Sequence, residues 1–196
     1  MKVVNKSVFC FALSILSIVG TSSLFVAPLY AFSGGPPPYV TGAPGDATCN
    51  ASGCHNSFAT NSATGVIFSI APVKGPAVYK PGKTVKLKVA FTNTSIANLH
   101  GFEMTAVDPS GNKVGTFKKI GMFTQVIPRL PKKDKGAYIE QTLQGSKKKF
   151  WIVKWTAPIG TPKIPVTLYA AGVDANKDGR ETGDYVYTTT LVVNPK

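Results

Sequence analysis

Short runs of alternating apolar and polar residues fill this chain from residue 64 to its end. The clearest is Thr84–Phe91, where Lys86 and Lys88 alternate with apolar neighbours. Turn-forming glycine, proline and asparagine separate such runs, and no stretch has the period of an amphipathic helix, so an all-β antiparallel sandwich is expected over 64–196. The other expected strands span residues 65–70, 100–107, 138–142, 150–155, 165–171 and 185–193. Lys118–Gly136, which contains two prolines, is expected to be a long irregular connection.

Ahead of these runs, four residues separate Cys49 from Cys54, and His55 follows the second cysteine directly. Two nearby cysteines followed by histidine are typical of c-type haem attachment, although the usual spacing is two residues. Each thiol can add across a haem vinyl group, and the adjacent imidazole can bind the iron. The spacing therefore predicts covalent haem c held by a loop.

Two other interpretations of the cysteines stay open. Cys49 and Cys54 could form a small disulfide, as an even cysteine pair in an exported chain permits. Alternatively, Cys49, Cys54, His55 and His100 could supply four ligands to zinc, although adjacent Cys54 and His55 suit one tetrahedral ion poorly.

A six-coordinate haem needs a second axial ligand opposite His55. His100 is the other histidine of the chain, and it shares strand parity with apolar Phe102 and Met104. We expect His100 to be the distal iron ligand, with the Met104 sulfur as the alternative.

Near the C-terminus, Asp174, Asn176 and Asp178 place oxygen-bearing side chains at alternate positions before Gly179. This is the opening half of a calcium-binding loop, but it lacks the glutamate that normally closes such a loop. A calcium site and a simple polar turn are both compatible with this pattern.

The first 31 residues combine Lys2 and Lys6 with a long uncharged apolar run, which predicts a secretory signal peptide cleaved after Ala31. An uncleaved membrane anchor is the alternative. Residues 32–63 are rich in proline, glycine and small polar residues, so they are expected to form an extended lead-in that carries the haem loop.

The formal net charge is +13. Export would exclude nucleic acid as the partner of so basic a chain and would favour an acidic redox protein, a neighbouring cytochrome or a cell surface. No nucleophile elbow or phosphate-binding loop is present, and Glu103 and Glu140 are expected at exposed strand positions, so an enzyme is not expected.

Several short motifs occur together in the order 41–46, 101–106, 155–158, 169–172 and 183–185. With the cysteines, they resemble the secreted bacterial choice-of-anchor V domains, which are distantly similar to the reelin N-terminal domain. The resemblance implies an immunoglobulin-like or reelin-like β-sandwich outside the cytoplasm, and family members carry a Cys-Cys-His signature with two-residue spacing.

Two functional hypotheses follow. In the first, the protein is an exported monohaem c-type cytochrome that transfers single electrons. Such a cytochrome could also self-assemble or bind a cell surface. In the second hypothesis, the protein is a structural or adhesive surface module, closed by a Cys49–Cys54 disulfide and stabilised by calcium.

Overall fold

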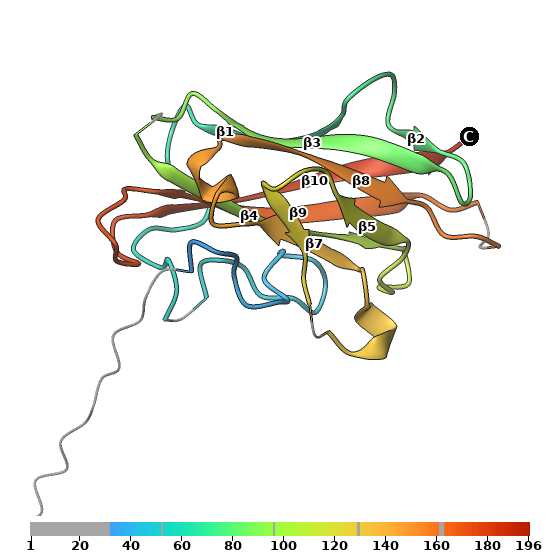
Figure 1. Ribbon diagram of the computed structural model, residues 1–196, viewed down its shortest axis with the longest axis horizontal. Coiled ribbons are helices and arrows are strands. Elements are labelled where there is room, and N and C mark those ends of the chain that lie inside the picture. The colour runs from blue at the N-terminus through green and yellow to red at the C-terminus, as the bar shows by residue number, and fades with distance from the viewer. Residues whose placement is uncertain (1–31, 52, 96, 129, 161–162) are drawn as a thin grey trace, which may run out of the picture.

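Two sheets packed face to face, antiparallel except for one short parallel pairing in the larger sheet, form the body of the protein in a computed structural model (Figure 1). The structure describes residues 32–51, 53–95, 97–128, 130–160 and 163–196. The four-stranded sheet has the order β1-β3-β8-β5, and the six-stranded sheet has the order β2-β10-β9-β4-β7-β6. The strands are β1 (Ile67–Pro72), β2 (Val78–Tyr79), β3 (Thr84–Thr92), β4 (Leu99–Val107), β5 (Thr116–Lys119), β6 (Thr124–Val126), β7 (Tyr138–Gln141), β8 (Phe150–Thr156), β9 (Val166–Ala175) and β10 (Tyr185–Pro195).

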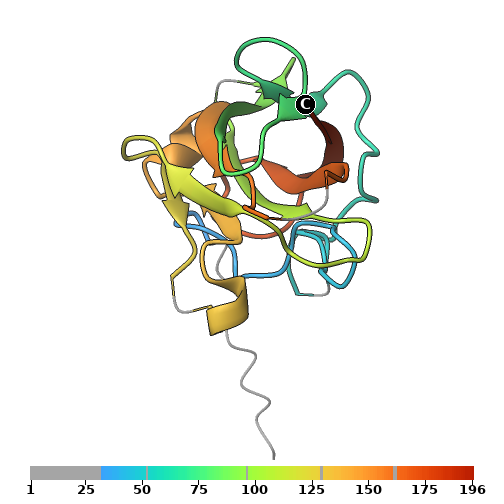
Figure 2. The same cartoon turned by 90° about the vertical axis from the view of Figure 1, so that its right-hand side faces the viewer.

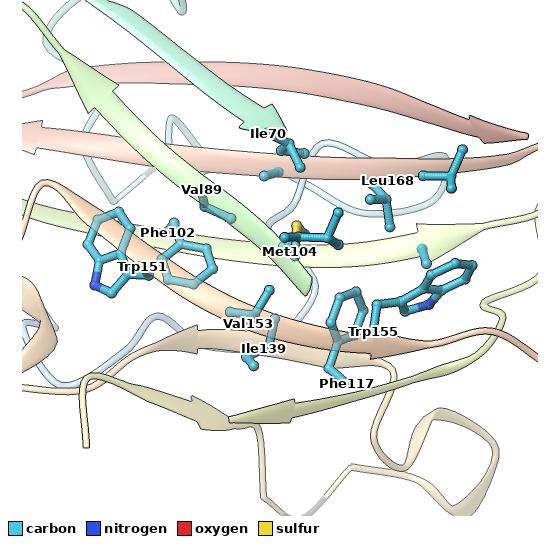
Figure 3. Close-up of a cluster of buried hydrophobic side chains, with 14 of the residues drawn as sticks. Ile70, Val89, Phe102, Met104, Phe117, Ile139, Trp151, Val153, Trp155 and Leu168 are labelled. Atoms are coloured by element: carbon cyan, nitrogen blue, oxygen red, sulfur yellow. The ribbon is translucent and has the colours of Figure 1, made fainter. Parts of the chain in front are cut away.

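Alternation along each strand explains why the two sheets pack together. Large apolar side chains of one parity point inward, because successive side chains of a strand project to opposite faces. Trp151 and Trp155 of β8 are almost completely buried, and they lie in one cluster with Phe102 and Met104 of β4 (Figure 3). The two sheets therefore share a single continuous core.

The expected all-β sandwich is confirmed, and each segment expected to be a strand contains one. Inside the connection expected to be irregular, the chain instead forms β6, the end of β5 and the 3₁₀ turn η1 (Lys132–Asp134). These strands are too short for a two-residue period to show in sequence. Their backbone groups find partners at the sheet edges, on β7 and β8.

The lead-in covers the outer face of the six-stranded sheet. In Figure 1 its blue and cyan segments run below β4, β9 and β7, and the end view in Figure 2 places them outside the two layers. Val40 and Cys49 pack there against Ala171, Val173 and Val186. The expected signal peptide, residues 1–31, lies outside the described residues, and in the described part of the chain no helix is long and apolar enough to cross a membrane.

Candidate cofactor site at the Cys49–His55 loop

Backbone hydrogen bonds close the Cys49–His55 segment into a compact loop. The His55 amide donates to the Cys49 carbonyl at 3.1 Å, and the Cys54 amide donates to the Ala51 carbonyl at 2.9 Å. Gly53 has a φ of 80°, a left-handed conformation that glycine adopts without steric cost. The fold of the loop therefore brings the two ends of the Cys-Cys-His motif together.

His55 is fixed by a carboxylate that lies 129 positions later in the chain. Its Nδ1 is 2.6 Å from Oδ2 of Asp184, a side chain with no solvent exposure. The other oxygen of Asp184 accepts a 2.8 Å hydrogen bond from the Asn176 amide. A carboxylate partner at Nδ1 keeps the proton on that nitrogen, so that Nε2 can act as a ligand.

A cavity of about 150 Å³ that opens to solvent lies between this loop and the outer face of the six-stranded sheet. Both cysteines, His55 and His100 are among the residues that line it. The rest of its wall is mostly apolar and includes Val40, Leu99, Phe102, Val173 and Ala175. The structure thus gathers Cys49, Cys54 and His55 around one cavity, and His100 borders this cavity from β4.

The two thiols differ in environment, and no disulfide joins them. Cys49 is buried, whereas Cys54 is half-buried. Burial raises the pKa of the Cys49 thiol well above its usual range, and the neighbouring Glu103 adds to this effect. A thiol with a raised pKa stays protonated at neutral pH and reacts slowly without further activation.

His100 has a different set of partners from His55. Its Nε2 is 3.0 Å from Oγ1 of Thr94 and 3.3 Å from Oδ1 of Asp174, and its ring lies 5.2 Å from that of Phe91. Phe91 belongs to the opposite sheet, so the imidazole of His100 points into the sandwich, on the other side of the sheet from Cys49. Distal ligation by His100 stays a prediction, and it would require the imidazole to leave these partners.

Replacement of His100 with alanine distinguishes a structural role of this histidine from distal ligation of haem iron. If His100 only holds the β3–β4 connection, His100→Ala should lower the free energy of unfolding by about 2–3 kcal/mol, because the buried Asp174 loses a partner. The absorption spectrum of a haem-loaded sample should then be unchanged. A change to a high-spin spectrum would instead assign the distal position to His100.

Met104, the alternative distal ligand, is fully buried in the core between the sheets. Like His100, it has the inward parity of β4, and core packing surrounds its thioether (Figure 3). Its use as an iron ligand stays a prediction that would require the core to open.

The predicted calcium residues are held by hydrogen bonds within the protein. Asp174 accepts from Thr94 at 2.6 Å and from Asn98 at 2.7 Å. Asn176 and Asp178 instead accept from backbone amides of their own turn, at 2.9 Å and 2.8 Å. Across the residues that the structure describes, no group of three or more histidine, cysteine or acidic residues is placed to hold a metal ion.

Glu103 and Glu140 were expected at exposed strand positions, and this expectation is wrong, because both are buried side by side on paired positions of β4 and β7. Glu103 accepts hydrogen bonds from the amides of Tyr39 and Val40, at 3.0 Å and 3.1 Å. These bonds hold Tyr39 at a φ of 72°, which is rare for an aromatic residue. The pair anchors the lead-in to the sheet, a role that alternation along β4 and β7 does not reveal.

Burial raises the pKa of both carboxyl groups, that of Glu103 to about 8 and that of Glu140 to about 7. Gln125 donates to Oε1 of Glu140 at 2.7 Å, while Oε2 of Glu140 is buried without a hydrogen-bond partner among the described residues. A side chain at Gly35 would lie 2.5 Å from the Glu140 carboxyl group, so the lead-in approaches very closely here.

These features define a β-sandwich whose N-terminal lead-in packs on one face and closes a cysteine- and histidine-lined cavity. The Reeler domain model matches residues 47–177, and the chain belongs to the Reeler domain family.

Two solved structures are similar to this chain. The reelin-N domain of F-spondin superposes with a TM-score of 0.50 at 20% identity, covering 66% of this chain and 86% of that domain. The human F-spondin reeler domain has a TM-score of 0.49 at 20% identity, covering 66% of this chain and 88% of the other. No curated protein matches the sequence.

Proposed function

We propose that this protein is an exported monohaem c-type cytochrome that transfers single electrons outside the cytoplasm. The observation that carries the proposal is the 2.6 Å contact between His55 Nδ1 and buried Asp184 at a cavity lined by both thiols. Iron-binding histidines commonly donate their second ring nitrogen to a carboxylate or carbonyl, which fixes the tautomer and raises the basicity of the ligand.

The residues at the cavity fit a haem by the chemistry of their donor set. Cys49 and Cys54 are unbonded thiols that can each form a thioether, and His55 offers an imidazole nitrogen. The enclosed volume of about 150 Å³ is smaller than a typical small-molecule site, so a porphyrin would also extend across the open side.

Each residue would have a distinct task in such a site. When bound, haem supplies an iron that alternates between two oxidation states. Asp184 would orient His55, while Val40 and Val173 would exclude water from one edge of the ring. Surface lysines would attract an acidic redox partner or a neighbouring cytochrome and raise the rate of encounter.

The test is to export the protein through a host with cytochrome c maturation and record its absorption spectrum and intact mass. We expect a Soret band and a mass increased by one haem that acidified butanone does not extract. The Cys49→Ala/Cys54→Ala variant should fold and carry no covalent haem. A colourless wild-type protein would contradict the proposal.

A second candidate is a structural or adhesive surface module of the choice-of-anchor V type, closed by a Cys49–Cys54 disulfide. It is favoured by the fold shared with the F-spondin domain and by the placement of both cysteines at one cavity. A colourless protein whose mass is lower by two hydrogens, with both thiols blocked to alkylation, would support this candidate. Calcium at Asp174, Asn176 and Asp178 would then appear as a rise in melting temperature that EDTA reverses.

A further inference from the structure

The outward face of the four-stranded sheet carries a concentration of lysines. Four lysines project from the face of this sheet that points away from the core, whereas Leu87, Val153 and Trp155 project into the core. We call these residues the lysine face: Lys86, Lys88, Lys118 and Lys154. No aspartate or glutamate occurs anywhere in β1, β3, β5 or β8, although the chain has nine acidic residues.

Strand register places three of these lysines in one row. Lys86 pairs directly with Lys154, which in turn pairs directly with Lys118. Adjacent strands are about 4.8 Å apart, and like charges placed directly opposite each other destabilise a sheet. The ion pairs of the described residues involve His55, His100 and Lys113 instead. The row therefore does not stabilise the sheet, and its alignment favours a role in binding.

Exposed apolar side chains continue the lysine face at one end. Phe150 is 49% exposed, and its ring lies 5.0 Å from the Lys88 ammonium. Beyond it, the Lys148 ammonium lies 4.7 Å from the ring of Phe123. Thr142 donates a hydrogen bond to the Met122 carbonyl, which brings the two neighbouring loops together. We call the exposed apolar residues of this region the apolar edge: Met122, Phe123, Leu143 and Phe150.

We propose that the lysine face and the apolar edge dock this protein on the surface of an anionic lipid bilayer. Lysines near such a surface gain electrostatic free energy from acidic headgroups, and their flexible ammonium groups need no fixed geometry. Exposed aromatic and aliphatic side chains beside them can enter the boundary between headgroups and acyl chains. A soluble polyanion would use the lysines alone, so the apolar edge favours lipid. This inference is independent of haem.

Vesicle sedimentation tests the proposal with purified protein. We expect binding to vesicles of equal parts phosphatidylcholine and phosphatidylglycerol, and little binding to phosphatidylcholine alone. Lys86→Gln/Lys118→Gln/Lys154→Gln should weaken binding on the order of 100-fold, since each lysine contributes roughly five-fold. The matched control is Lys132→Gln/Lys133→Gln/Lys135→Gln, which removes the same charge from exposed positions at η1 and should weaken binding only a few-fold.

Three further measurements distinguish a lipid bilayer from a soluble acidic polymer or protein as the partner of this surface. Met122→Ser/Leu143→Ser should weaken vesicle binding several-fold without changing its salt dependence, because the apolar edge carries no charge. The Lys86→Gln/Lys118→Gln/Lys154→Gln variant, called the row variant, should melt at the same temperature as wild type or at a higher one. That result would show that the row variant folds. Equal losses in the row and control variants would overturn the proposal. So would full competition by soluble polyglutamate at matched charge, because that result would assign the face to an acidic polymer or protein.

Discussion

Replacement of Asp184 with alanine is expected to free the Cys49–His55 loop and to lower the free energy of unfolding by about 2–4 kcal/mol. Asp184 is fully buried, and its two oxygens hold His55 Nδ1 and the Asn176 amide. Its loss leaves both groups without this acceptor and removes the contact that ties His55 to the β9–β10 connection. Urea denaturation gives the stability change, and limited proteolysis detects opening of the loop.

Asp178→Ala is the matched control for this experiment. Asp178 is an acidic residue of the same connection, but it is exposed and bonds only within its own turn. The Asp178→Ala substitution should change the free energy of unfolding by less than about 1 kcal/mol. In haem-loaded protein, Asp184→Ala should also weaken axial ligation by roughly 10- to 100-fold. Similar behaviour of the two variants would show that the His55–Asp184 contact does not organise the site.

The second large effect is a loss of stability as the pH rises. Folding raises the pKa of Glu140 from 4.5 to about 7 and that of Glu103 from 4.5 to about 8. The folded state therefore favours the protonated carboxyl groups. Their contribution is complete below about pH 4.5 and is lost as the pH rises through 7 and 8. Asp174 acts in the opposite direction, since its lowered pKa removes stability only below its ordinary value of 3.8.

Glu140→Gln tests this linkage because glutamine keeps the shape of the side chain and cannot ionise. At pH 8 it should raise the free energy of unfolding on the order of 2 kcal/mol relative to wild type, and near pH 4.5 the two proteins should differ little. Glu181→Gln, in the β9–β10 connection, is the control and should follow the wild-type curve. Wild-type stability that stays flat or increases from pH 5 to pH 8 would contradict the assignment.

The strand pattern and the Cys-Cys-His motif could be predicted because both are local in sequence. Alternation in Thr84–Phe91 follows from the two-residue period of a strand, and His55 is adjacent to Cys54. The same local pattern predicted solvent exposure for Glu103 and Glu140, and this prediction was wrong. Alternation assigns them to the face away from the core, but it does not reveal that the lead-in covers that face.

What the sequence by itself determined is therefore the class of fold, the position of its main strands and a candidate set of sulfur and nitrogen ligands. Only the tertiary structure decided that Asp184 holds His55 and that the cysteine loop lies on the opposite side of the sheet from the inward-facing His100. It also aligned Lys86, Lys154 and Lys118 in one row. The physical reason is that these contacts join residues far apart in the chain, and strand pairing and sheet packing alone set their distances.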